Sequence, residues 1–449
     1  MKKSTLLLIV LLIVTAGIVF WYIQRDTRPA VEHLPDVSSA PASWFDADST
    51  LAPSDSIPFN NPNATPEAFH LWAWQKFLSL TRTAANTAPF QEYVQVDNDL
   101  VKLGSTIELI DSTQAGTGGV LYDTTARAIY YTLHVNKTMY AFQQENLDLF
   151  APIYAKYKGL SDRDAKIQHA LDSLGYDTLN YPVGAVELKT SWIMASSLKS
   201  TADYYTTYAN VHTANGIRSV KVALLGMHVI GRVVNHPQFI WATFEHDDMV
   251  PDYSWAQPGY PLLGDTLSHK NYLFYQQNNV IGNCLMNNNS ATFAGFSNIF
   301  NIYPLGIARS FTGSNVPNKQ DRVNDAIVRS LNRSVKRQLA KCREVWQHYF
   351  YKGAIWLNFP NTDYRPGNGN LGLLTRKSLN GNRALSNSTM ETFAQLNFSG
   401  NYTTGSMNCF GCHATVDYKN VQPNTNDSIS FNLALSHLFK NALLKAEGD

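Results

Sequence analysis

The sequence has few cysteines and almost no net charge. Its 449 residues include 4 cysteines, too few for a disulfide framework in a chain of this length. Lysine and arginine total 36 against 35 aspartates and glutamates, so the net charge of +1 gives no overall attraction to nucleic acid. Charged residues make up 16% of the chain, whereas 44% is hydrophobic and 12% aromatic, which excludes an intrinsically disordered, collagen-like or coiled-coil protein. The chain is therefore expected to fold around a sizeable core.

The amino terminus contains a long apolar run. Lys2 and Lys3 precede residues 5–23, a stretch without a charged side chain. As a helix this stretch would be about 28 Å long, close to the thickness of the hydrocarbon core of a bilayer. The lysines place its start in the cytoplasm and the rest of the chain across the membrane. We predict that residues 1–26 anchor a periplasmic domain in the bacterial inner membrane; a cleaved signal peptide is the alternative and also leads to the periplasm.

Two further regions follow the predicted anchor. Residues 27–63 are rich in Pro, Ser, Asp and Asn and are predicted to form a flexible tether. Residues 64–449 are predicted to form a single domain. It opens with a helix that begins at Thr65 and Pro66, and it continues with segments rich in β-branched and aromatic residues, typical of strands, at 128–135, 183–192, 220–234 and 239–244. Asn235, His236 and Pro237 indicate a turn between the last two.

Helical patterns return towards the carboxyl end. Apolar residues recur on one face of 321–351, which predicts one long helix with a basic opposite face, and a final helix is expected over 429–444. The basic face could attract an acidic redox partner or neutralise haem propionates, although a solvated surface is the commoner meaning. Together these patterns predict an α+β domain with antiparallel strands and peripheral helices.

The clearest chemical signal is Cys409-Phe410-Gly411-Cys412-His413. This C-x-x-C-H pattern is the attachment signal of c-type haem, in which two thiols bond the porphyrin and the histidine ligates iron. A zinc site would need about four ligands, and the two remaining cysteines, Cys284 and Cys342, form no second paired motif. A thioredoxin-like pair would follow a strand and open a helix, whereas this motif follows a Gly/Ser/Thr-rich segment. We therefore predict one covalently attached haem c.

The motif's place in the chain also matters. Only 36 residues follow His413, too few for a small cytochrome domain that begins with its attachment motif. The segment of about 385–449 is therefore expected to pack the haem against the large domain before it. Cys284 and Cys342 could pair in the oxidising periplasm, but Cys342 also fits an apolar helix face, and both alternatives stay open.

Several further segments resemble a group of bacterial cytochrome c family proteins of about this length, which carry a single attachment motif near the carboxyl end. The matching segments are 73–78, 186–192, 226–230, 239–246, 346–349, 387–392 and 427–431, besides the motif itself. The sequence departs from the group after the first helix, where Thr81-Arg82-Thr83 replaces an Asn-Trp-Pro run, and at 357–360. The resemblance implies haem binding and electron transfer, but it does not identify a substrate.

The sixth iron ligand cannot be chosen from the sequence alone. Met390, which is near the motif in the chain, and His228, within an apolar strand, are the first candidates; Met227 and His246 are further ones. A methionine would raise the reduction potential, a second histidine would lower it, and an open position would allow ligand chemistry. For each residue, packing in the core or in a loop is the alternative.

These observations predict a membrane-tethered monohaem c-type cytochrome that transfers single electrons in the periplasm. Its partners would be redox proteins and the membrane, not nucleic acid. The alternatives are a haem enzyme of the peroxidase type with an open distal site, and a sensor or binding module that uses haem structurally.

Overall fold

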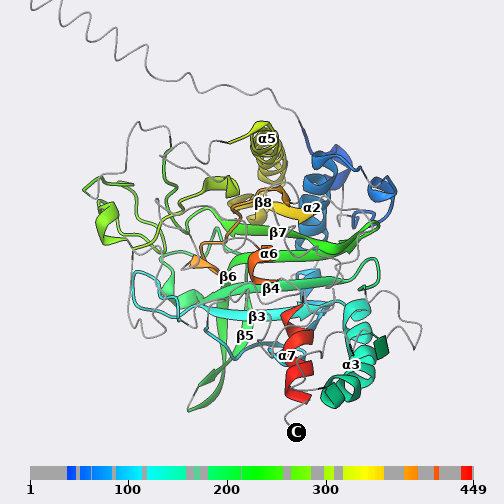
Figure 1. Cartoon of the computed structure of the whole chain (residues 1–449). Helices are drawn as coiled ribbons and strands as arrows, with labels where there is room; N and C mark the ends of the chain where they lie inside the picture. Colours follow the sequence, from blue (N-terminus) through cyan, green and yellow to red (C-terminus); the bar gives the residue numbers. More distant parts are fainter. Residues whose placement is uncertain are drawn as a thin grey trace, which may run out of the picture.

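The structure is a computed structural model that describes the greater part of the domain. The described residues are 38–46, 51–61, 63–82, 87–113, 119–157, 166, 169–170, 180–213, 215–255, 264–284, 298–307, 317–357, 379–392, 409–413 and 436–446. Within them the protein is a mixed α/β fold with a large, mainly antiparallel sheet and few helices (Figure 1). The expected fold class is confirmed at this level.

The centre of the fold is a sheet of nine described strands. Its main path runs β1 (Val94–Val96), β3 (Tyr130–Val135), β4 (Val186–Met194), β6 (Gly216–Val233), β7 (His236–His246), β8 (Tyr349–Leu357) and β9 (Leu379–Gly381). Two more strands, β2 (Ile107–Leu109) and β5 (Thr206–Thr213), pair in parallel, and β5 joins the sheet along β6. All other strand pairs are antiparallel.

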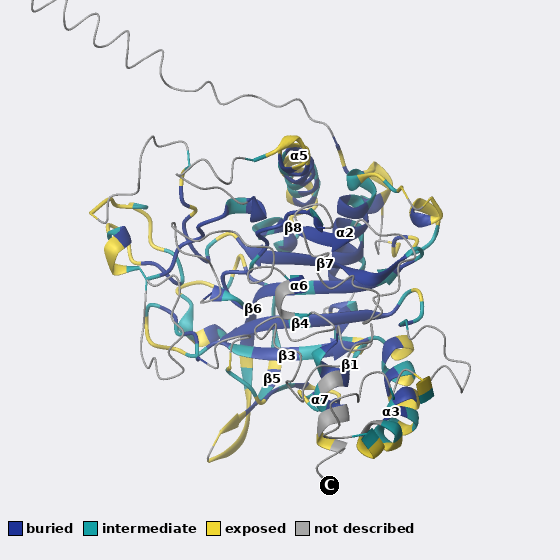
Figure 2. Cartoon of the chain, in the orientation of Figure 1, coloured by how far each residue is buried: buried dark blue, intermediate teal, exposed yellow. Residues whose placement is uncertain are grey.

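Helices cover both faces of this sheet. On one face α2 (Pro66–Thr81) and α5 (Lys319–Lys341) pack on a core that includes Met227 and Val229 of β6. On the other face lie α3 (Lys137–Tyr157), α6 (Cys409–Cys412) and α7 (His437–Ala446) (Figure 1). Because side chains alternate along a strand, β6 serves both layers, and its central part is almost entirely buried (Figure 2).

Most of the predicted elements are present. The helix expected from Thr65 is α2, with Pro66 at its first turn, and the four predicted strand segments overlap β3, β4, β6 and β7. The turn between β6 and β7 is shorter than expected: Val234 and Asn235 form it, and Asn235 adopts a φ of 63°, which asparagine tolerates better than most residues. His236 and Pro237 already belong to β7.

The helix predicted over 321–351 is wrong at its carboxyl end. α5 ends at Lys341, Arg343 has a left-handed φ of 55°, and Tyr349 begins strand β8. The aromatic side chains at 346–351 continue the apolar spacing of the helix, but they pack in the sheet core instead. Cys342 is consequently exposed beyond the helix, and both Cys342 and Cys284 are free thiols.

The amino-terminal predictions are only partly within the described residues. Residues 1–37, with the predicted membrane anchor, lie outside them, and no described helix has the length and apolar character needed to cross a membrane. Part of the predicted tether is packed on the domain: Trp44 and Phe59 are buried in the α2/α5 core, and Asp55 accepts a hydrogen bond from the Trp72 indole at 2.7 Å. The final helix is described from His437, and 429–435 lie outside the described residues.

Candidate functional site

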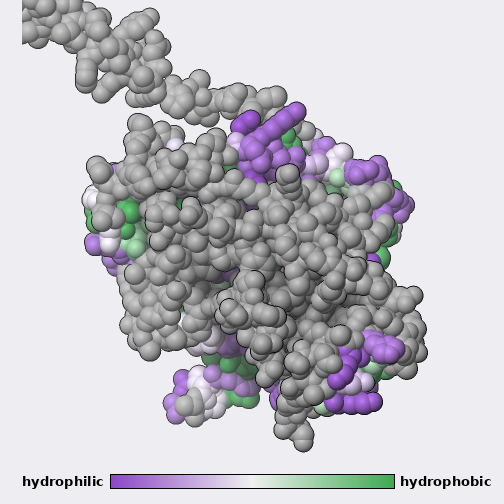
Figure 3. All heavy atoms as spheres, in the orientation of Figure 1, coloured by the Kyte–Doolittle hydropathy of each residue, from purple (hydrophilic) through white to green (hydrophobic). Residues whose placement is uncertain are grey.

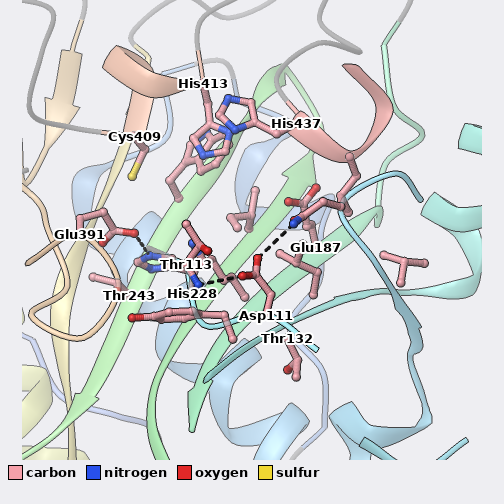
Figure 4. A pocket seen from close by; sticks show the side chains of 18 of the residues that line it. Asp111, Thr113, Thr132, Glu187, His228, Thr243, Glu391, Cys409, His413 and His437 are labelled. Carbon is pink, nitrogen blue, oxygen red and sulfur yellow. Dashed lines mark hydrogen bonds and ion pairs between the residues drawn. The ribbon is translucent and has the colours of Figure 1, made fainter. Parts of the chain in front are cut away.

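A cavity of about 340 Å³ lies on the sheet face opposite α2 and α5. Strands β3, β4, β6 and β7 contribute to its floor, while α6, α7 and the segment around 385–391 contribute to its walls. Cys409 and His413 of the C-x-x-C-H motif both line it (Figure 4). Its volume falls in the range of about 300–1,000 Å³ that is typical of ligand and cofactor sites.

Strand register creates the floor. Lys189 of β4 pairs with His228 of β6, which pairs with Thr243 of β7, so a polar row crosses three strands. Two residues along, Glu187, Ile230 and Trp241 form the next row on the same face. The floor therefore brings together side chains from segments that are far apart in the chain, with Ile230 and Trp241 supplying its apolar part.

The motif itself is a short helical turn held against this floor. The His413 backbone N–H donates to the Cys409 carbonyl at 2.7 Å. Phe410, between the two cysteines, is 2% exposed and packs edge-on against Trp241, with ring centroids 6.0 Å apart. The His413 ring also contacts Trp241, at 4.4 Å between centroids. Phe410 thus anchors the motif to β7 and directs His413 towards the cavity.

His437 is a site residue that the sequence analysis missed. Its ring stacks on His413 at a centroid distance of 4.0 Å and an interplanar angle of 17°, and it lines the same cavity. Figure 4 shows the two rings side by side at one end of the cavity. The available signal was a histidine at the start of an amphipathic helix close behind the motif.

The structure separates the candidates for the sixth ligand. His228 lines the cavity. Met390 does not: it is fully buried in a separate apolar cluster with Leu121 and Ile129. Met227 points to the opposite face of the sheet, and His246 stacks on Tyr204 at 3.8 Å, outside the cavity lining. Of the four candidates, His228 alone shares the cavity with His413.

His228 is held by a carboxylate. Its Nε2 lies 2.7 Å from Oε1 of Glu391, whose second oxygen accepts the Asn387 N–H at 2.9 Å. Burial opposes ionisation of Glu391, but the attraction and hydrogen bond of His228 outweigh it, so the pKa of this carboxyl lies below its usual value. The result is a hydrogen-bonded, oriented His–Glu pair on the cavity floor (Figure 4).

Glu187 is a second acidic residue that the sequence analysis did not single out. Its carboxylate is 5% exposed and accepts a hydrogen bond from the Ser436 hydroxyl at 2.7 Å. Burial raises the pKa of Glu187 to about 7, although the Ser436 hydrogen bond and the charge of Lys189 both lower it. Glu187 and Lys189 alternate with apolar residues in β4, so a charged pair on one face of a strand was the signal to follow.

The basic stripe on α5 is not part of this site. α5 packs on the far face of the sheet through Ile327, Leu331 and Val335. Its exposed side chains form a hydrophilic surface at the top of Figure 3. The sheet lies between this helix and the cavity, so α5 cannot neutralise the acidic groups of a molecule bound there.

Cys409 and His413 of the motif share this cavity with a largely apolar lining. The Cys409 thiol and His413 open onto one space, and Tyr131, Leu133, Ile230, Trp241, Leu385 and Leu438 give it the apolar surface that a porphyrin requires. The described residues contain no group of three or more His, Cys, Asp or Glu that could hold a metal ion. No protein-family model, no curated protein and no solved structure matches this chain.

Proposed function

We propose that the protein is a monohaem c-type cytochrome that transfers single electrons in the periplasm, tethered to the inner membrane by residues 1–26. The observation that carries the proposal is that Cys409 and His413 of a C-x-x-C-H motif line one cavity of cofactor size. Cys409 and Cys412 would form the two thioether bonds, and His413 would be the proximal iron ligand. When bound, the haem supplies a one-electron couple whose potential depends on ligation and burial.

The protein's own residues account for the rest of the site. Phe410 and Trp241 fix the motif on the sheet, and the packed Trp241 ring keeps water from one side of His413. His437 covers another side of the same imidazole. A rigid and partly desolvated ligand environment lowers the reorganisation that accompanies a change of iron charge, which suits an electron carrier.

The test is covalent attachment. The full chain is produced with c-type maturation, extracted with acid acetone and examined by its alkaline pyridine spectrum. The wild type should retain its pigment, and Cys409→Ser should lose one thioether bond and most of the attached haem. Cys342→Ser is the matched control, because Cys342 is exposed and outside the cavity. Extraction of the pigment from the wild-type protein would refute the proposal.

A haem enzyme with an open distal site is the second candidate. The observation that favours it is the His228–Glu391 pair: the 2.7 Å bond occupies Nε2 of His228, and such a pair on a cavity floor can move a proton on a bound substrate. High-spin ferric iron that binds cyanide rapidly, with peroxide turnover that His228→Ala abolishes, would support the enzyme. Low-spin iron with two fixed ligands would support the carrier.

A further inference from the structure

Three carboxylates lie on the cavity side of the sheet, of which Glu187 and Glu245 are buried and Glu391 is partly exposed, and they differ in how their charge is compensated. Glu245 is paired with Lys352 at 3.2 Å and accepts two hydrogen bonds from Ser388, at 2.9 and 3.0 Å. Glu391 is bonded to His228 and to a backbone N–H. Among the described residues, the Glu187 carboxylate has one hydrogen-bond donor, the neutral Ser436 hydroxyl. Glu187 is therefore the least compensated of the three.

A carboxylate in this position is poised between its two forms. A buried charge needs a cation or several donors to replace its lost hydration, and one hydroxyl does not suffice. Burial consequently raises the pKa of Glu187 to about 7. A modest change of charge nearby will shift the balance between the protonated and the ionised side chain.

The candidate iron ligand lies in the same cavity. Glu187 and His413 both line it, and the Ser436 that donates to Glu187 directly precedes His437, which stacks on His413 at 4.0 Å. Charges at a partly buried site interact more strongly than charges in bulk water. An electron added at this site would therefore stabilise the protonated form of Glu187, and by thermodynamic linkage a proton on Glu187 would stabilise the added electron.

We propose that Glu187 couples electron transfer to proton uptake. This inference rests on the proposed function. When the site accepts one electron from a one-electron donor, the Glu187 carboxylate takes one proton from solvent through the cavity. One O–H bond forms, and the net charge of the cavity is unchanged. Oxidation reverses both events, and the proton returns to solvent.

The titratable groups around Glu187 differ from it in charge or in burial. Lys189 follows it on the same strand face, and Tyr181 is buried behind it, where burial keeps the phenol protonated by raising its pKa well above the usual value. The other titratable side chains on the cavity are Tyr131, His413 with His437, His228 with Glu391, and Cys409, Asp97 and Asp111. The pKa of Glu391 lies below its usual value, which favours the ionised form.

The experiment is a set of redox titrations of the matured holoprotein between pH 5 and 9. The wild-type midpoint potential should fall with pH around neutrality, with a slope approaching about 59 mV per pH unit, the value for one proton per electron. Glu187→Gln should remove this slope. Glu92→Gln is the control, with the same substitution at an exposed glutamate outside the cavity lining, and should keep it. Infrared redox difference spectra should show a carboxylic acid band on reduction in the wild type and none in Glu187→Gln.

The outcomes separate this inference from the proposed function. Absence of attached haem in the wild type would remove both. Attached haem with a flat wild-type titration, or a Glu187→Gln variant that keeps the full slope, would overturn the coupling alone. If Glu187→Gln does not mature, Glu187→Asp decides: a shorter carboxyl should keep the slope but centre it at another pH, and an unchanged profile would contradict the proposal.

Discussion

The Glu187 carboxyl should make the stability of the protein fall as pH rises towards neutrality. Its pKa is about 7 in the native state and 4.5 in its ordinary state. Between these values the native protein holds a proton that the unfolded chain has lost, so the free energy of unfolding decreases with increasing pH. This pKa difference corresponds to about 3 kcal/mol of unfolding free energy, which is present below about pH 4.5 and lost by the time the pH has risen above about 7.

Glu187→Gln tests this value because glutamine has the same shape and does not titrate. We expect urea unfolding of the oxidised wild-type holoprotein to give a free energy about 3 kcal/mol lower at pH 8 than at pH 4.5, beyond the change measured for Glu187→Gln. The comparison requires equal m-values for the two proteins. An identical pH dependence in both would refute the assignment of a raised pKa to this buried carboxyl.

Three further predictions concern residues away from Glu187. His70 is fully buried, which lowers its pKa to about 4. On acidification the unfolded chain therefore binds a proton at this histidine before the native protein does, and the free energy of unfolding should fall by about 3 kcal/mol between pH 6.5 and 4. Calorimetry that shows no loss of stability over this range would contradict the prediction. Gly226→Ala would place the new Cβ 2.9 Å from the Thr389 hydroxyl oxygen and should lower the stability measured by thermal unfolding by about 1–3 kcal/mol. Gly264→Ala is the control and should leave stability unchanged, because no atom lies within 4 Å of its Cβ. Equal losses of stability in the two variants would refute the packing argument. Arg383→Met would leave the buried Asp321 carboxylate without its ion-pair partner, which lies at 2.5 Å. The free energy of unfolding measured in urea should fall by about 3–5 kcal/mol. A fall of less than about 1 kcal/mol would show that the ion pair is not buried in solution.

Local patterns were sufficient for the elements that run through the core. The apolar, β-branched composition of the segment that forms β6 and the spacing of Phe69, Trp72 and Phe77 in α2 correspond to residues that are buried. The helical spacing of apolar residues gave a wrong helix end where strand β8 follows α5 closely. Trp346 and Phe350 continue the apolar stripe of α5, yet the backbone turns at Arg343 and the following residues pair with β7. Long-range strand pairing decided the structure there, and no local signal encodes it.

The sequence by itself was enough to predict a chemistry for the carboxyl end, because C-x-x-C-H is a contiguous motif whose meaning depends on neighbouring residues. It could not choose between Met390 and His228, nor find Glu187, Glu391 and His437. Nearness in the chain favoured Met390, but that side chain packs away from the cavity, while the register of β4, β6 and β7 carries His228 into it. A site assembled from one face of a sheet depends on which strands are neighbours and in which register, and only the folded chain determines both.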